Sequence, residues 1–220
     1  MLKKGLKMLL KFFETLFYFV YIPVLSVTGV ILIYISNSYA QFLSGVMALV
    51  MVIAECFFIF PRGAIIWHKR TVEKAINMGK GRKINSILFT FVFILLWNVA
   101  ILLLHPYFSN WVLIQFYSLC LIRIILCLFP QNRWKSIRPP LSWTIIRNIP
   151  YFLTGLMICC VLFWGRNKIP AIEFAWLALL LSLVFWIPRI LLFRNRTVEG
   201  ILIIPRALCF LWILAMFIYI

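Results

Sequence analysis

Seven long apolar runs, separated by short polar gaps, make up most of this 220-residue chain. Each run is long enough for a helix to cross the roughly 30 Å hydrocarbon core of a bilayer. The expected spans cover residues of about 13–36, 42–60, 85–105, 111–129, 149–165, 170–193 and 200–220. The polar gaps are too short to bury a core of their own. The sequence therefore predicts one integral membrane domain over residues 1–220, an all-α polytopic bundle of about seven spans.

Positive charge collects in every second gap. The chain has 22 Lys and Arg against 5 acids, all of them Glu. Of these cations, 19 lie in or beside the N-terminus and the gaps after the second, fourth and sixth spans. Arg166 and Lys168 lie in a gap on the other side, and Arg123 lies within a span. Because cytoplasmic loops accumulate Lys and Arg, this pattern predicts a cytoplasmic N-terminus and a multi-pass protein of the cell (inner or plasma) membrane.

The net charge of +17 bears on the expected partners. In a soluble protein it would indicate nucleic-acid binding. Here the cations orient the spans, so a nucleic acid is not expected, and the basic loops are expected to lie against anionic lipid headgroups. A cytosolic or membrane partner protein at these loops, and a homo-oligomer, remain open alternatives.

The first run has one competing interpretation. Its basic start and the residues Ser38-Tyr39-Ala40 resemble a signal peptide with its cleavage site. However, the apolar stretch exceeds 20 residues, whereas the apolar region of a signal peptide has about 7–15. We expect the span to be retained; cleavage would leave six spans and an external N-terminus.

Two segments of the chain share a pattern. Phe60-Pro61-Arg62 precedes Arg70-Thr71-Val72-Glu73, and Ile187-Pro188-Arg189 precedes Arg196-Thr197-Val198-Glu199. Pro61 and Pro188 are 127 residues and four spans apart, so the copies share one orientation, as in a parallel repeat. A proline near a span end permits a kink, and Thr71 and Thr197 are candidate helix N-caps. Chance recurrence of such pairs at loop edges is the alternative.

This arrangement resembles the PQ-loop and SWEET sugar-transporter families, in which a Pro ends a span, a basic loop follows and the unit recurs in parallel. The segment from Pro188 through Arg196-Thr197-Val198-Glu199-Gly200 is the most similar. The chain has Pro-Arg where those families have Pro-Gln, an extra leading span and no third span after the second copy. The resemblance implies transport. The two repeated segments themselves supply a candidate hinge set, which consists of Pro61, Arg70, Glu73, Pro188, Arg196 and Glu199.

Two charged residues lie within the spans themselves. Glu55 precedes Pro61 by six residues, and Arg123 precedes Pro130 by seven. Both spans run toward the cytoplasm, which places the two side chains at similar depth. Because charges at membrane depth are costly, Glu55 and Arg123 are a candidate intramembrane ion pair. Snorkelling of Arg123 to the headgroups is the alternative.

The ionisable residues argue against catalysis. The chain has no Asp, and His68 and His105 are expected on opposite sides of the membrane. The six Cys all lie in apolar runs, as packing residues do. We therefore expect no enzyme activity, no catalytic residue, no cofactor and no metal site.

Two functions remain from the sequence. The first is a small-solute transporter or permease, which should lose activity in Glu55→Gln and tolerate changes of loop charge. The alternative is a membrane-embedded subunit or pore of a multi-protein complex, including a defence or toxin-type effector, that docks a partner through its basic cytoplasmic loops.

Overall fold

The computed structural model describes residues 2–67, 71–107, 109–136, 139–191 and 196–220, and omits the side chains of 2–4, 6, 7, 189–191 and 196–199. The described residues form helices and turns, with no strand among them. In chain order the elements are α1 (Leu2–Tyr34), α2 (Tyr39–Trp67), α3 (Val72–Leu104), α4 (Asn110–Leu128), η1 (Pro130–Asn132), α5 (Leu141–Ile146), α6 (Ile149–Trp164), η2 (Pro170–Ile172), α7 (Ala175–Leu191) and α8 (Arg196–Phe217).

Seven segments of the described chain are long and apolar enough to cross a membrane. The prediction of an all-α polytopic bundle is confirmed. The 16 residues of α6 span about 24 Å, less than the roughly 30 Å core. The short helix α5 precedes α6 directly and completes that segment, which runs from Leu141 to Trp164.

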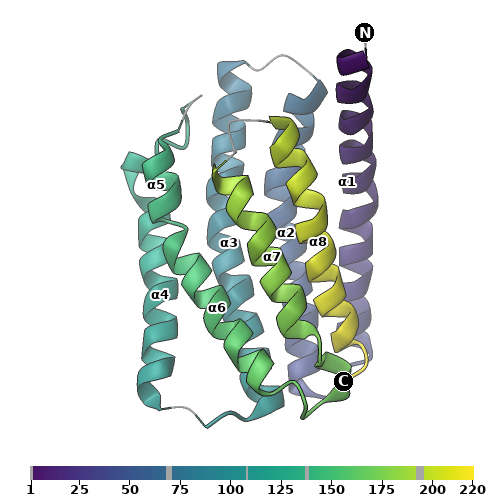
Figure 1. The fold of residues 1–220 in the computed structure, drawn as a ribbon, viewed down its shortest axis with the longest axis vertical. Helices are drawn as coiled ribbons and strands as arrows, with labels where there is room; N and C mark the ends of the chain where they lie inside the picture. The colour runs from purple at the N-terminus through teal and green to yellow at the C-terminus, as the bar shows by residue number, and fades with distance from the viewer. Residues whose placement is uncertain (1, 68–70, 108, 137–138, 192–195) are drawn as a thin grey trace.

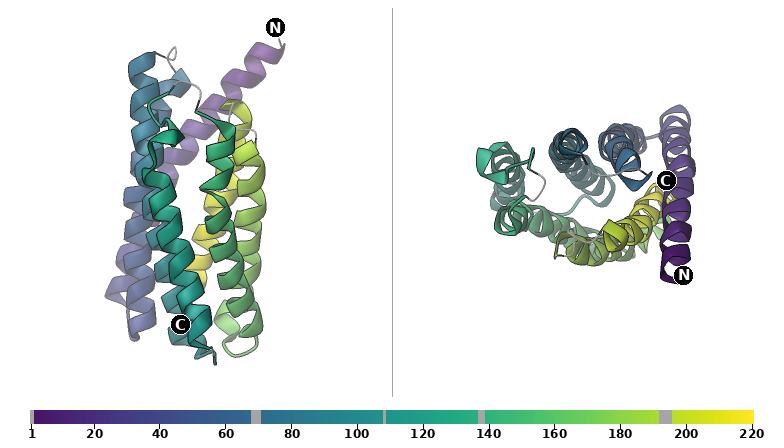
Figure 2. Two further views of the ribbon diagram at one scale, coloured as in Figure 1. Left: turned by 90° about the vertical axis from the view of Figure 1, so that its left-hand side faces the viewer. Right: turned by 90° about the horizontal axis from the view of Figure 1, so that it is seen from above.

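The helices form two layers that are joined at both edges. Helices α2, α3 and α4 make one layer, and α6, α7 and α8 make the other, as the view from above in Figure 2 shows. At one edge α4 packs on α6. At the other edge α1 packs on both α2 and α8. The inner faces of the layers bury a core rich in aromatic side chains, including Phe58, Phe89, Trp97, Tyr151 and Phe210.

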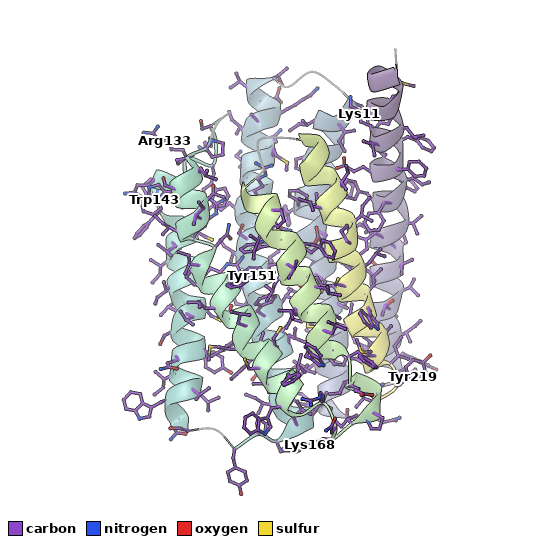
Figure 3. All side chains as sticks on the ribbon, in the orientation of Figure 1. Lys11, Arg133, Trp143, Tyr151, Lys168 and Tyr219 are labelled. Atoms are coloured by element: carbon purple, nitrogen blue, oxygen red, sulfur yellow. The ribbon has the colours of Figure 1, made fainter. Side chains whose placement is uncertain are left out.

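The start of α1, the end of α2 and the start of α3 lie at one end of the bundle, and the C-terminus lies at the other (Figure 1). Lys11 and Arg133 mark the first end and Lys168 the second (Figure 3). We call the first end the basic end. Helix α3 begins at Val72, well before the expected span of 85–105, and its 33 residues are about 50 Å long. Because this exceeds the hydrocarbon core by about 20 Å, its first turns extend past the apolar layer at the basic end.

The prolines of the hinge set lie inside helices. Helix α2 continues through Pro61 to Trp67, and α7 continues through Pro188 to Leu191. Packed neighbouring helices allow transmembrane helices to keep such prolines. Thr71 is the N-cap of α3, and its hydroxyl accepts a hydrogen bond from the backbone N–H of Lys74 at 3.3 Å, so that capping prediction is confirmed.

Candidate functional site

Four arginine side chains from four elements surround one cavity near the basic end. They are Arg82 of α3, Arg123 of α4, Arg147 at the C-cap of α5 and Arg206 of α8. We call this space the arginine cavity. Its volume is ≈ 90 Å³, enough for a small anion or several water molecules. The other described lining residues are uncharged, so no carboxylate is among them.

Arg123 is the most isolated of these cations. It lies five residues before the end of α4 and is only 3% exposed. Its guanidinium lies 3.8 Å from the centroid of the Tyr151 ring, in cation–π geometry. Among the described residues, neither its Nε nor its Nη1 has a hydrogen-bond partner. Arg123 thus contributes a buried positive charge, and its Nε and Nη1 donors remain available to a ligand.

Arg206 has a carboxylate partner. Its Nη1 lies 3.6 Å from Oε1 of Glu55 on α2, and both side chains are buried. The guanidinium lies over the ring of Phe89, 4.3 Å from the centroid. Glu55 therefore offsets the charge of Arg206, although the Nε of Arg206 has no hydrogen-bond partner within the described chain.

Arg147 is held by neutral partners in the loop after α4. Its Nη1 donates to Oδ1 of Asn132 at 2.9 Å, and its guanidinium lies 4.0 Å from the centroid of the Trp134 ring. Asn132 in turn donates to the carbonyls of Leu126 and Phe129, at 2.6 and 3.0 Å. These bonds fix the loop over the end of α4 and direct Arg147 toward the cavity without neutralising it.

Glycine allows this loop to sit against α3. A Cβ at Gly79 would overlap the backbone carbonyl of Trp134, so no larger residue fits that position without moving the loop. The Nε1 of Trp134 donates to the carbonyl of Cys127 at 2.9 Å, which ties the same loop to α4. The wall of the cavity that carries Trp134 is therefore built by close packing from both sides.

A layer of stacked aromatic rings lies on the far side of the cavity. Tyr151 stacks on Phe93 at a centroid distance of 4.2 Å. One helical turn further along α3, Trp97 stacks on Phe116 of α4 at 4.3 Å. All four rings are at most 1% exposed. The cavity reaches the loop residues Trp134 and Ser136 at the basic end, whereas these rings close it toward the opposite end.

The structure gives both predicted intramembrane ions different partners from those expected. Glu55 pairs with Arg206, and Arg123 lies over Tyr151. Similar depth did not determine the pairing, because depth says nothing about which helices are neighbours: α2 contacts α8, whereas α4 packs on α3 and α6. The alternative, snorkelling of Arg123 to the headgroups, also disagrees with the structure, because the side chain is only 3% exposed.

Three cations that sequence reasoning placed in the basic loops are buried. Arg62, Arg147 and Arg206 are 4%, 7% and 4% exposed. For Arg206 a signal was present, because it stands between two apolar stretches, Ile201–Ile204 and Ala207–Phe210. Arg147 also stands among apolar residues. It follows Ile145 and Ile146, and Ile149 comes two residues after it.

A second buried ion pair joins α1 and α2 at the basic end. The Nε of Arg62 donates to Oε1 of Glu14 at 2.5 Å. The hydroxyl of Tyr18 also donates to this oxygen, at 2.7 Å. Gly200 of α8 lies so close that a Cβ there would overlap the Glu14 carboxylate. Glu14 follows two phenylalanines within an apolar run, and no sequence pattern marked it as one half of an ion pair.

The remaining members of the hinge set are Arg70, Glu73, Arg196 and Glu199, and the structure describes only the side chain of Glu73. Glu73 is exposed in the first turn of α3. Arg70 lies outside the described residues, and so do the side chains of Arg196 and Glu199 in α8. The roles of Arg70, Arg196 and Glu199 in the hinge set therefore stay predictions.

A larger cavity of ≈ 440 Å³ lies at the opposite end, between the ends of α3 and α6. Its lining includes one Lys or Arg, Lys168, whose Nζ donates to the carbonyl of Leu104 at 2.6 Å. His105 also lines it, in left-handed backbone geometry as the C-cap of α3. Despite its volume, this cavity offers little chemistry that selects a ligand, and we regard the arginine cavity as the candidate site.

Comparison of the chain with protein-family models, with curated proteins and with solved structures gives no match. The resemblance to the PQ-loop and SWEET families and the internal repeat therefore stay predictions. We therefore infer the function from the geometry of the arginine cavity.

Proposed function

We propose that this protein is a non-catalytic transporter or permease of the cell membrane that binds an anionic solute in the arginine cavity. The observation that carries the proposal is the burial of Arg123 and Arg147 without a carboxylate partner among the described residues. Burying a charge costs several kcal/mol unless a partner compensates it. A bound anion would supply that compensation.

Within the described part of the chain, the cavity is accessible from one end of the bundle only, which supports transport rather than simple binding. The cavity extends to the loops of the basic end, and stacked rings separate it from the opposite end. Carriers that alternate between two sides have a binding site that is open to one side at a time. In this proposal Tyr151, which touches both Arg123 and Phe93, couples the bound anion to the aromatic layer.

The proposal is tested by flux in proteoliposomes. We expect the wild-type protein to accelerate either uptake of radiolabelled inorganic phosphate or transbilayer movement of an acyl-labelled phosphatidic acid. Arg123→Gln should lower the rate at least tenfold, because a charged hydrogen bond contributes about 1.5–3 kcal/mol and about 1.4 kcal/mol equals a factor of ten.

Arg133→Gln is the matched control, since Arg133 is an exposed cation of the same end that does not line the cavity. Its rate should equal that of the wild type. If neither probe moves faster than in protein-free vesicles, transport of these anions is contradicted. The alternative of a membrane-embedded subunit, docking a partner through the basic end, would then be favoured.

A further inference from the structure

An apolar groove adjoins the arginine cavity on the outside of the bundle. It has a volume of ≈ 210 Å³ and lies between α5–α6 and α7. Asn148 and Trp186 line both the groove and the cavity, so the two spaces adjoin at these side chains. The groove is otherwise lined by aliphatic and aromatic side chains, among them Ile149, Leu153 and Ile187.

The groove opens toward the lipid. Ile149, Leu153 and Ile187 are 51%, 41% and 39% exposed, and all three belong to segments apolar enough to span the membrane. Outward-facing apolar side chains of such segments contact acyl chains, because no other apolar solvent is present there. A molecule that occupies both spaces therefore needs one anionic end and one hydrocarbon end.

The charges of the cavity select a phosphate. Glu55 offsets Arg206, which leaves Arg123 and Arg147 as two buried cations without a carboxylate among the described residues. A phosphate monoester carries a charge of about −1.5 to −2 and three acceptor oxygens. It can therefore bind both guanidinium groups at once, since each presents a planar fork of donors that matches phosphate geometry.

The depth of the cavity also fits a lipid headgroup. The first turns of α3 extend past the apolar layer, and Arg82 lies ten residues into this helix, about 15 Å from its start. That distance is close to the roughly 20 Å by which α3 exceeds the hydrocarbon core. Arg82 and the mouth of the cavity accordingly lie near the level of the lipid phosphates.

We infer that the arginine cavity and the groove together bind a membrane lipid with a terminal phosphate headgroup. The phosphate lies between Arg123 and Arg147, and one hydrocarbon chain follows the groove past Trp186 and Leu153. This inference rests on the proposed function, because it names the class of solute that the transporter takes.

Binding to the purified full-length protein in neutral detergent tests the inference separately from transport. The probe is an acyl-labelled phosphatidic acid, followed by fluorescence anisotropy. We expect unlabelled phosphatidic acid to displace it at least tenfold more strongly than diacylglycerol with the same chains, or than inorganic phosphate. Arg123→Gln and Arg147→Gln should each weaken probe binding at least tenfold, whereas Arg133→Gln should not change it.

A second variant tests the contribution of the hydrocarbon chain to binding separately from that of the headgroup. Leu153→Trp fills the groove without changing charge, so it should weaken phosphatidic acid severalfold and leave weak binding of inorganic phosphate unchanged. Gel filtration establishes that each variant is folded.

If inorganic phosphate competes as well as the lipid, the lipid inference fails and an anion transporter remains. If diacylglycerol competes equally, the headgroup assignment fails. If the lipid binds as expected but no flux occurs, the transport proposal fails instead.

Discussion

Replacing Arg62 with Met will lower the free energy of unfolding by about 3–5 kcal/mol. The substitution removes the cation that contacts Glu14 at 2.5 Å and leaves this carboxylate, 7% exposed, with the Tyr18 hydroxyl as its only donor among the described residues. Leaving a buried charge without its partner costs far more free energy than formation of the ion pair contributed. The measurement is unfolding of the purified protein in mixed micelles of increasing denaturing-detergent content.

The double variant Glu14→Leu with Arg62→Met is the control. Because it removes both charges, we expect most of the lost stability to return. Arg62→Met alone should also loosen α1, since Glu14 lies between α2 and Gly200 of α8. A single variant as stable as the wild type would contradict this description of the α1–α2 contact.

Replacing Glu55 with Leu will have an effect of similar size, about 3–5 kcal/mol. It leaves Arg206 buried at 4% exposure with the faces of Phe89 and Phe210 as its remaining described ring contacts. Cation–π contacts contribute about 2 kcal/mol at buried sites, less than a lost counter-ion costs. Stability is again measured by unfolding in mixed micelles.

Double-mutant cycles identify the partner of Glu55. A cycle with Arg206→Met should give a coupling energy of about 1–3 kcal/mol, and a cycle with Arg123→Met a value near zero. The two cycles therefore distinguish the Glu55–Arg206 pair of the structure from the Glu55–Arg123 pair that the sequence predicts. Coupling of Glu55 to Arg123 instead of Arg206 would show that α2 and α4, rather than α2 and α8, bring their charges together.

The sequence determined the class of fold well because its signal is averaged over many residues. Each span depends on about 20 apolar positions, and the orientation depends on 19 cations, so single exceptions change neither result. The capping role of Thr71 was equally accessible, since it depends on local contacts within one turn.

The candidate site was less accessible, because it depends on which helix faces lie together. Arg147 and Arg206 were counted as loop cations, and a count of charges cannot tell a snorkelling side chain from one that turns into the bundle. Glu55 and Arg123 were recognised individually. Their partners were not, since helix order around the bundle is set by packing that no local pattern encodes.

Native mass spectrometry of the full-length protein, released from neutral micelles after incubation with phosphatidic acid, tests whether Arg123 and Arg147 hold a phosphate-bearing anion in the arginine cavity. We expect one retained phosphatidic acid on the wild type and on Arg133→Gln, and none on Arg123→Gln. Equal retention by Arg123→Gln and the wild type, or no retention by any of the three proteins, would contradict this assignment of the phosphate site.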